Sequence, residues 1–496
     1  MDVVTVAEDR PVSVTAPGLD ASPAPTVRRL LRLAWPVVVS RSSQVVVGVT
    51  DAIMVAHLGE AALAATTTGA ANTFNLLILP MGVVFIVASF AAQFTGEGNP
   101  RGARRYGWYG LGLALLTQAI CLVGLPAVPR LLAAVGHEGE VLRLMSAYLQ
   151  VRLLTGGAVV GMEALGAYYG GLGNTRLPMV VNLTTMALNV FGNWVFIRGN
   201  LGAPALGVAG AALASALASA VGFGLLFACF LFGFGAQRIV GRVHLVWPEF
   251  VRTLRFGLPV GLNWFFEFLA FSFFINVVVA GLGTTTLAAF MIVLQINAVS
   301  FMPAFGIASA GAILVGQAIG AGRLADVPRV VRLTAGTAAV WQGLVGLSYL
   351  LAPALLMRPF IDERTATPQL LGIGATMLRL SASWQLFDAA AMTLAEALRA
   401  AGDTAFTMWV RVALAWALFI PGVWFSVRVA GGTHVAATAW LIVYIALLAV
   451  VFLWRFRGGA WRRIDLTGRR EMDGPRAGSL APTGQDAALW RPSGPG

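Results

Sequence analysis

The sequence contains no lysine, and only 11% of its 496 residues are charged, whereas 58% are hydrophobic. A soluble domain carries about 25% charged residues, so this chain has too few polar groups to cover the surface of a soluble globular fold. Its two cysteines, Cys121 and Cys229, lie within apolar runs, which argues against a structural disulfide. The four histidines are scattered along the chain, so no metal site is predicted.

Long apolar runs are abundant instead. A bilayer core about 30 Å thick needs roughly 20 apolar residues per helix. We therefore predict an all-α integral membrane protein with twelve transmembrane helices, at residues 31–57, 62–94, 108–128, 141–169, 178–197, 207–234, 251–280, 286–319, 332–356, 370–400, 404–427 and 434–454. The flanking segments 1–27 and 458–496 are rich in Pro, Gly, Arg and Asp, and we expect both to be disordered.

The charges indicate the orientation of these helices. Basic residues number 34 and acidic ones 22, a net charge of +12, and every basic residue is an arginine. The arginines cluster at the ends of apolar runs, so we expect no nucleic-acid partner. Arg-rich loops, such as the one with Arg101, Arg104 and Arg105, alternate with Arg-poor loops. Because basic residues stay on the cytoplasmic side, the alternation predicts both termini in the cytoplasm and a location in the cell (inner) membrane.

Short motifs recur between the two halves of the chain at a nearly constant spacing. The recurring landmarks are Pro36 and Pro259, Leu58-Gly59 and Leu282-Gly283, Gln93 and Gln317, and Gly173-Asn174-Thr175 and Gly402-Asp403-Thr404. The alternative is that Gly and Pro recur because membrane helices tolerate them. Six spans per half predict two parallel repeats, an N-terminal lobe at 28–236 and a C-terminal lobe at 237–457, with a substrate path between them.

Ionisable residues within the first predicted spans are candidates for function, since an acid in the membrane costs on the order of 3 kcal/mol. Asp51 shares a helical face with Gln44, so this polar stripe faces the protein interior or a cavity. Asn189 and Asn193 also share a face, and either line a cavity or hold helices together. Arg41 is ten residues, about 15 Å, from Asp51 and needs an acid on another helix.

Two further acids, Glu267 and Asp388, lie in the second half. The helical neighbours of Glu267 include Asn263, Trp264 and Phe271, and an acid among aromatic rings suits an organic cation. The alternative is that these rings face lipid. Asp388 shares its face with Trp384, Gln385, Ala391 and Met392. Glu163 and Glu396 lie near helix ends, where they either meet water or pair with arginine.

Three stretches carry a resemblance to a known family. They are Val49-Thr50-Asp51-Ala52-Ile53-Met54, Gly257-Leu258-Pro259 with Phe266-Glu267, and Leu398-Arg399-Ala400-Ala401-Gly402-Asp403-Thr404. Over about residues 28–455 the chain resembles the multidrug and toxic compound extrusion (MATE) family, closest to its NorM-like branch. The resemblance implies two six-helix lobes around a V-shaped cavity. It also implies export of cationic, often aromatic compounds, driven by inward movement of protons or sodium.

The resemblance assigns roles to individual residues. It implies ion coupling by Asp51, Glu267 and Asp388, and it makes Glu267 and Asp388 candidates for binding a sodium ion. The usual His-Gln of the branch's eighth span reads Phe290-Met291 here. We expect substrate contacts from the polar and aromatic side chains of both halves, namely Gln44, Asn189, Asn193, Asn263, Trp264, Phe271, Gln295, Trp384, Gln385 and Met392.

We therefore predict a cation-coupled antiporter that is not an enzyme, uses H⁺ or Na⁺ and needs no cofactor. Its expected partners are the lipid bilayer and small organic cations, and we expect a monomer. The alternative function is a flippase for lipid-linked oligosaccharides or lipids. That function would favour an Arg-lined cavity for a phosphate headgroup, whereas the predicted central groups are mostly acidic. An enzyme would need a nucleophile, metal ligands or a paired-acid motif, and the sequence shows none.

Overall fold

The computed structural model describes residues 26–237, 243–361 and 367–468, and this part of the chain is almost entirely helical, without a β-strand. Six passes form the first half: α1 Val27–Ala56, α2 Glu60–Phe85 with α3 Val87–Gly96, α4 Pro100–Gly124 with α5 Val128–Ala134, α6 Gly139–Leu153 with α7 Gly156–Gly171, α8 Arg176–Arg198 and α9 Val208–Phe232.

Six passes also form the second half. They are α10 Trp247–Phe273 with its continuation η3 Phe274–Val279, α11 Thr284–Gly320, α12 Val327–Leu351 with α13 Pro353–Met357, α14 Pro368–Ala400, α15 Thr404–Ala413 with α16 Ile420–Trp424, and α17 His434–Arg457. The predicted twelve-helix membrane fold is confirmed.

Within the described ranges, ten passes are long and apolar enough by themselves to cross a membrane. The remaining two passes do not meet this requirement, each for a physical reason. The α6–α7 pass is broken after Leu153 into helices of 15 and 16 residues. Helix α14 carries charged residues, Arg379, Asp388, Glu396 and Arg399. Both passes have protein neighbours: α6 packs on α2 and α9, and α14 packs on α11, α12 and α17. Polar groups are tolerated at membrane depth where protein covers them.

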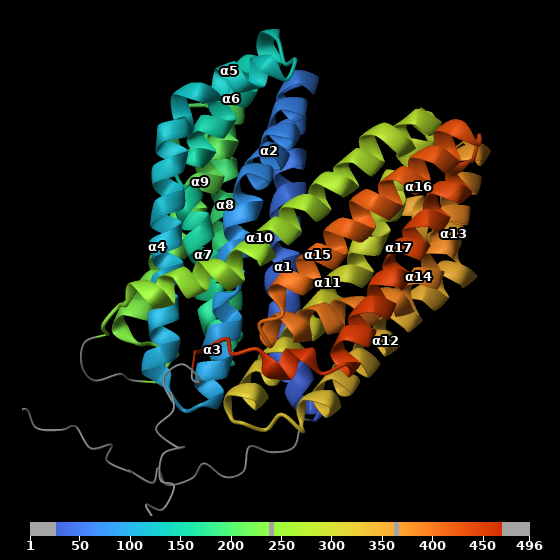
Figure 1. The fold of residues 1–496 in the computed structure, drawn as a ribbon. Helices are drawn as coiled ribbons and strands as arrows, with labels where there is room; N and C mark the ends of the chain where they lie inside the picture. The colour runs from blue at the N-terminus through green and yellow to red at the C-terminus, as the bar shows by residue number, and fades with distance from the viewer. Residues whose placement is uncertain (1–25, 238–242, 362–366, 469–496) are drawn as a thin grey trace, which may run out of the picture.

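Figure 1 shows the two halves as separate bundles that lie close together at one end and diverge toward the other. We call the close end, where α1 begins and α17 ends, the base. Helix α2 packs on α10, α3 packs on α11, and α1 lies along α11 of the other bundle. The two lobes therefore meet through a small set of helices from each half.

The internal repeat is visible in the backbone. Gly59 precedes α2 with φ +108°, and Gly283 precedes α11 with φ +105°. Gly173 and Gly402, which follow α7 and α14, have φ values of +84° and +91°. Only glycine adopts such angles without strain, so each glycine pair marks the same turn in both halves. The repeat predicted from spaced motifs is thus reproduced as equivalent geometry.

At the base, each lobe contributes the same contact to the other. The Gln93 side chain on α3 donates to the backbone carbonyl of Ala400 at 2.8 Å, and the Gln317 side chain on α11 donates to that of Gly171 at 3.2 Å. One turn further on, Gly96 faces the carbonyl of Gln317 and Gly320 faces the carbonyl of Gln93, both too closely for a side chain. These two glutamines and two glycines form what we call the glutamine clasp.

The C-terminal segment is ordered further than expected. The predicted disordered tail covers 458–496, but the chain is structured as far as Gly468. Trp461 stacks on Phe456 with ring centroids 5.4 Å apart, and the Arg252 guanidinium donates to the Thr467 carbonyl at 3.0 Å. Burial of apolar side chains and a hydrogen bond between residues distant in the sequence hold residues 458–468 in place. The rest of the tail, and residues 1–25 of the expected disordered leader, lie outside the described residues.

Candidate functional site

A cavity of about 370 Å³ lies within the first lobe, and helices α1, α2, α6, α7, α8 and α9 supply most of its wall. This volume lies within the range of sites that hold drug-sized ligands, roughly 300–1,000 Å³. One face of α1 lines it with Ser40, Ser43, Gln44 and Asp51. The predicted polar stripe of the first span therefore faces a cavity, as expected.

Asp51 is held in the wall by neutral hydrogen-bond donors. Asn193 donates to its Oδ1 atom, and the Ser215 hydroxyl donates to its Oδ2 atom at 3.2 Å. Asn189 in turn donates to Ser215 at 2.8 Å. Among the described residues no arginine forms an ion pair with Asp51, although its side chain is only 6% exposed. Of the two asparagines predicted from the sequence, Asn193 joins α8 to α1 at this carboxylate, and Asn189 joins α8 to α9 through Ser215.

An ion pair lies deeper in the same cavity. The Arg41 guanidinium donates to both carboxylate oxygens of Glu163 on α7, at 2.6 and 3.1 Å. The rings of Phe85 and Phe305 lie 5.9 and 5.7 Å from the Arg41 guanidinium carbon. Glu163 is the partner that the sequence required for Arg41 but did not identify. A two-pronged pair of this kind is among the strongest polar contacts.

A second arginine in the cavity wall forms an ion pair within its own helix and a hydrogen bond to the other lobe. Arg399 lines the cavity from α14 and pairs with Glu396, one turn earlier. Its guanidinium also donates to the Ser89 hydroxyl of α3 at 2.9 Å and stacks on Phe85 at 4.3 Å. Both Glu163 and Glu396 therefore pair with arginine, one of the two roles expected for them. Ser89 was not singled out from the sequence, which offered no signal for it.

The acids of the second lobe have different surroundings. Glu267 accepts from the Arg411 guanidinium through both carboxylate oxygens, one of them at 2.7 Å. Asp388 accepts from the Gln342 side chain at 2.8 Å and lies within the electrostatic range of Glu267 and Arg411. The structure thus brings the two predicted acids into one cluster. Arg411 was missed, although a lone arginine inside an apolar run was the signal that had identified Arg41.

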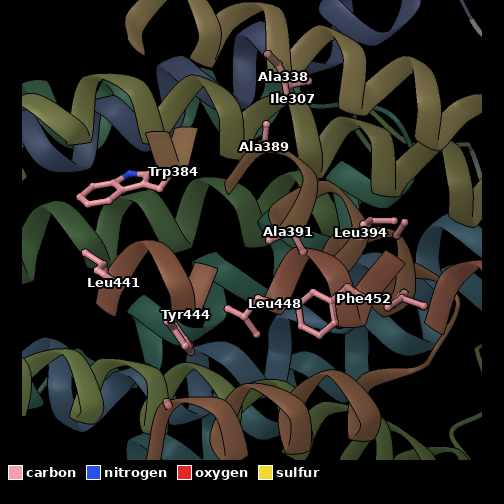
Figure 2. Close-up of a cluster of buried hydrophobic side chains, with 14 of the residues drawn as sticks. Ile307, Ala338, Trp384, Ala389, Ala391, Leu394, Leu441, Tyr444, Leu448 and Phe452 are labelled. Carbon is pink, nitrogen blue, oxygen red and sulfur yellow. The ribbon is translucent and has the colours of Figure 1, made fainter. Parts of the chain in front are cut away.

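The other residues predicted for the second lobe do not line the first-lobe cavity. Trp384 is buried in the hydrophobic core of the lobe, beside α17 (Figure 2). Gln385 is buried; it accepts a hydrogen bond from Ser300 and donates one to Asn297, both 2.8 Å long. Met392 is also buried, whereas Gln295 is exposed.

The predicted aromatic neighbours of Glu267 lie nearer the lobe interface. Trp264 packs against Phe85 of the first lobe with ring centroids 5.1 Å apart. Phe271 packs on Phe274 within the second lobe, at 6.3 Å. The Asn263 side-chain oxygen is buried without a hydrogen-bond donor among the described residues. These side chains extend from the lobe interface into the second lobe, and they do not share the cavity that contains Asp51.

Comparison with known proteins gives the same architecture. The MatE family model matches residues 36–195 and 259–425, one segment in each lobe. The chain belongs to the MatE family. Members of this family are membrane transporters and not enzymes, so the chain is a multi-pass membrane transporter.

Curated relatives of this MatE chain carry a common name. The "Probable multidrug resistance protein NorM" of Mesorhizobium japonicum is 31% identical over 402 residues, covering 80% of the chain and 86% of the relative. The protein of the same name from Thermotoga maritima is 29% identical over 454 residues, covering 90% and 96%.

Solved MATE structures share the fold. One, described as an outward-facing conformation of a multidrug resistance MATE family transporter, has a TM-score of 0.79 at 22% identity. The superposition covers 88% of this chain and 97% of that structure. A transporter from Pyrococcus furiosus, described as having a binding pocket of reverse polarity, has a TM-score of 0.78 at 21% identity with the same coverage. The two-lobe, twelve-helix arrangement is thus that of the family.

Proposed function

We propose that this chain is a multidrug efflux antiporter of the inner membrane, which exports organic, amphiphilic cations in exchange for protons or sodium ions. The observation that carries this proposal is the environment of Asp51. Its carboxylate lies in the wall of the 370 Å³ cavity and is held only by neutral donors among the described residues. The other acid that lines the cavity, Glu163, is already paired with Arg41.

A single buried carboxylate can exchange one cation for another. An unpaired charge in a low-dielectric site is costly, so Asp51 gains from binding either a proton, a sodium ion or the ammonium group of a substrate. Because the ligands share one carboxylate, binding of one displaces the other. Exchange becomes transport when the two ligands favour different conformations of the lobes, since a ligand shifts an equilibrium only by its differential affinity.

We assign the base to the cytoplasmic side. The arginine-rich loops and both ends of the described chain lie there, and basic residues stay in the cytoplasm. With the base closed by the glutamine clasp, the conformation is the one that releases substrate outward. Three first-lobe residues are proposed to act on substrate: Gln44, which lines the cavity, Asn193, which donates to Asp51, and Asn189, which donates to the Ser215 hydroxyl beside it.

The second lobe is proposed to couple an ion at Asp388. Arg411 neutralises Glu267, so the three charges of this cluster sum to a single negative charge. Within the described ranges, Asp388 accepts a hydrogen bond from the neutral Gln342 amide and has no ion-pair partner of its own. Aromatic residues between this cluster and the lobe interface, such as Trp264 and Phe271, remain proposed substrate contacts.

The flippase alternative requires free positive charge for a phosphate headgroup. The cavity is more cationic than the sequence predicted, because Arg41, Arg152 and Arg399 all line it. However, Arg41 forms an ion pair with Glu163 at 2.6 Å, and Arg399 forms one with Glu396. A cluster of free guanidinium groups is therefore absent from the cavity wall in the described structure, and efflux of cations is favoured.

Transport by the purified full-length protein in lipid vesicles tests this proposal. Proton and sodium gradients are imposed separately, and movement of a fluorescent organic cation is followed. We expect one gradient to drive transport, and Asp51→Asn to reduce the rate at least about tenfold, the loss of one charge-assisted contact. Glu140→Gln is the matched control, because Glu140 is an exposed acid on α6 outside the cavity. Transport that ignores both gradients would contradict the proposal.

A further inference from the structure

Arg152 differs from the other two arginines of the first-lobe cavity. It lies at the last turn of α6, just before the break that separates α6 from α7. Arg41 and Arg399 have glutamate partners, but Arg152 has no ion pair within the described part of the chain. Its Nη1 atom is buried and finds no hydrogen-bond acceptor there.

A buried donor without an acceptor is costly. Leaving a charged hydrogen-bonding group unsatisfied costs more than an ordinary missing hydrogen bond, and native structures contain few such groups. The described polar groups of the cavity do not satisfy Arg152 Nη1, and the donors to Asp51 are Asn193 and Ser215. The unfilled guanidinium therefore has binding capacity for an anionic group that enters the cavity.

Arg152 and Asp51 are close enough for their charges to interact. The charge of Arg152 acts on Asp51, and both charges act on Tyr148, which lies one turn before Arg152 and also lines the cavity. The cavity thus holds, among the described residues, one unpaired positive group and one unpaired negative group. Its remaining charges belong to the Arg41–Glu163 and Arg399–Glu396 pairs, so the whole site is close to neutral.

We propose that Arg152 binds a carboxylate of the exported compound while Asp51 binds its ammonium group, so that amphiphilic ammonium compounds that also carry a carboxylate bind better than those that lack one. This inference rests on the proposed function and specifies its substrate class. A guanidinium matches a carboxylate with two parallel hydrogen bonds. A zwitterion also leaves a neutral cavity neutral, whereas a simple cation adds a net charge to a low-dielectric site.

The competing explanation is that Arg152 serves only as a counter-charge for Asp51. In that case its removal would weaken every cationic ligand alike. Under the proposal its removal weakens only ligands that carry a carboxylate. The ratio of the two affinities therefore separates the explanations, and a general loss of function does not affect that ratio.

The experiment compares two forms of one aryl-substituted alkylamine, whose amine is protonated at neutral pH: the free carboxylic acid and its methyl ester. Both are tested as ligands of the purified full-length protein. Dissociation constants are measured in detergent and transport rates in lipid vesicles. For Arg152→Gln we expect the preference for acid over ester to fall about ten- to a hundredfold, the loss of a charge-assisted contact. Arg152→Lys restores part of it, since the charge returns without the planar fork. Arg143→Gln is the matched control, because Arg143 is exposed on the same helix.

Each outcome bears on the proposal. A fall of the acid-to-ester ratio in Arg152→Gln, but not in Arg143→Gln, supports it. A ratio that stays constant while both affinities drop identifies Arg152 as a counter-charge and overturns it. Wild-type protein that transports the ester but rejects the acid also overturns it, even if the variant does not fold. In the last two cases cation efflux persists in the wild type, so the proposed function stands; if neither form is transported, that function fails instead.

Discussion

The glutamine clasp makes a sharp prediction about the base of the molecule. Substituting alanine for Gly320 adds one methyl group, which meets the backbone carbonyl of Gln93 in the opposite lobe. The carbonyl belongs to a helix backbone and the methyl carbon is attached directly to one, so neither can turn aside as a flexible side chain would. Alanine for Gly96 meets the carbonyl of Gln317 in the same way. We expect each substitution to push α3 and α11 apart.

The size of the effect follows from two hydrogen bonds between the lobes. Separation of α3 from α11 breaks the bonds of Gln93 to Ala400 and of Gln317 to Gly171, which are 2.8 and 3.2 Å long. A typical hydrogen bond contributes about 1 kcal/mol, so the two together contribute about 2 kcal/mol. Such a change shifts the balance between closed and open bases about thirtyfold.

Distances between spin labels at Arg176 and Arg332 measure this shift. Both residues are exposed. Arg176 is the first residue of α8 in the first lobe, and Arg332 lies near the start of α12 in the second lobe. The labels require prior replacement of Cys121 and Cys229. We expect Gly320→Ala to increase the population with a long label distance. Gly336→Ala on α12 is the control, because a methyl group there meets nothing within 4 Å. An unchanged distance distribution in Gly320→Ala would refute the role of the clasp.

Further predictions concern the buried ion pairs. Arg411→Met leaves Glu267 without a partner, but the Glu267 side chain is 38% exposed and remains partly solvated, so thermal unfolding in detergent should show a loss of only about 1 kcal/mol; an unchanged melting temperature would argue against the pair. Arg41→Met should cost more, roughly 3–5 kcal/mol, while the double variant with Glu163→Met recovers much of the loss, because no unpaired charge remains. A double variant as unstable as the single one would contradict that reasoning. Ser89→Ala removes one donor–acceptor contact to Arg399 and should cost about 1 kcal/mol in the same assay.

The helices could be predicted because lipid imposes a strict demand on sequence. A membrane-spanning segment must be apolar over its length, so the predicted span 178–197 agrees closely with α8, Arg176–Arg198. The break between α6 and α7 was not predicted, since the run 141–169 contains no proline. The repeat was predictable because glycines with positive φ recur at the same turns.

The functional site was predictable only in part. Asp51 and its face of α1 were found because polar residues are rare in such a helix. Its contacts depend on which helices pack together, and the pairs Arg41–Glu163 and Glu267–Arg411 join residues 122 and 144 positions apart. Sequence periodicity describes one helix at a time, so it carries no information on such pairs. The position of the cavity, which is lined mostly by helices of the first lobe, likewise followed from packing.

Competition at Asp51 is the most direct test of the account. Binding of a fluorescent organic cation to the purified protein is measured as proton and sodium concentrations are raised separately. We predict that one of the two ions displaces the cation from the wild-type protein. In Asp51→Asn we predict weaker binding that no longer responds to that ion. Wild-type affinity together with unchanged ion competition in Asp51→Asn would contradict the claim that substrate and coupling ion share this carboxylate.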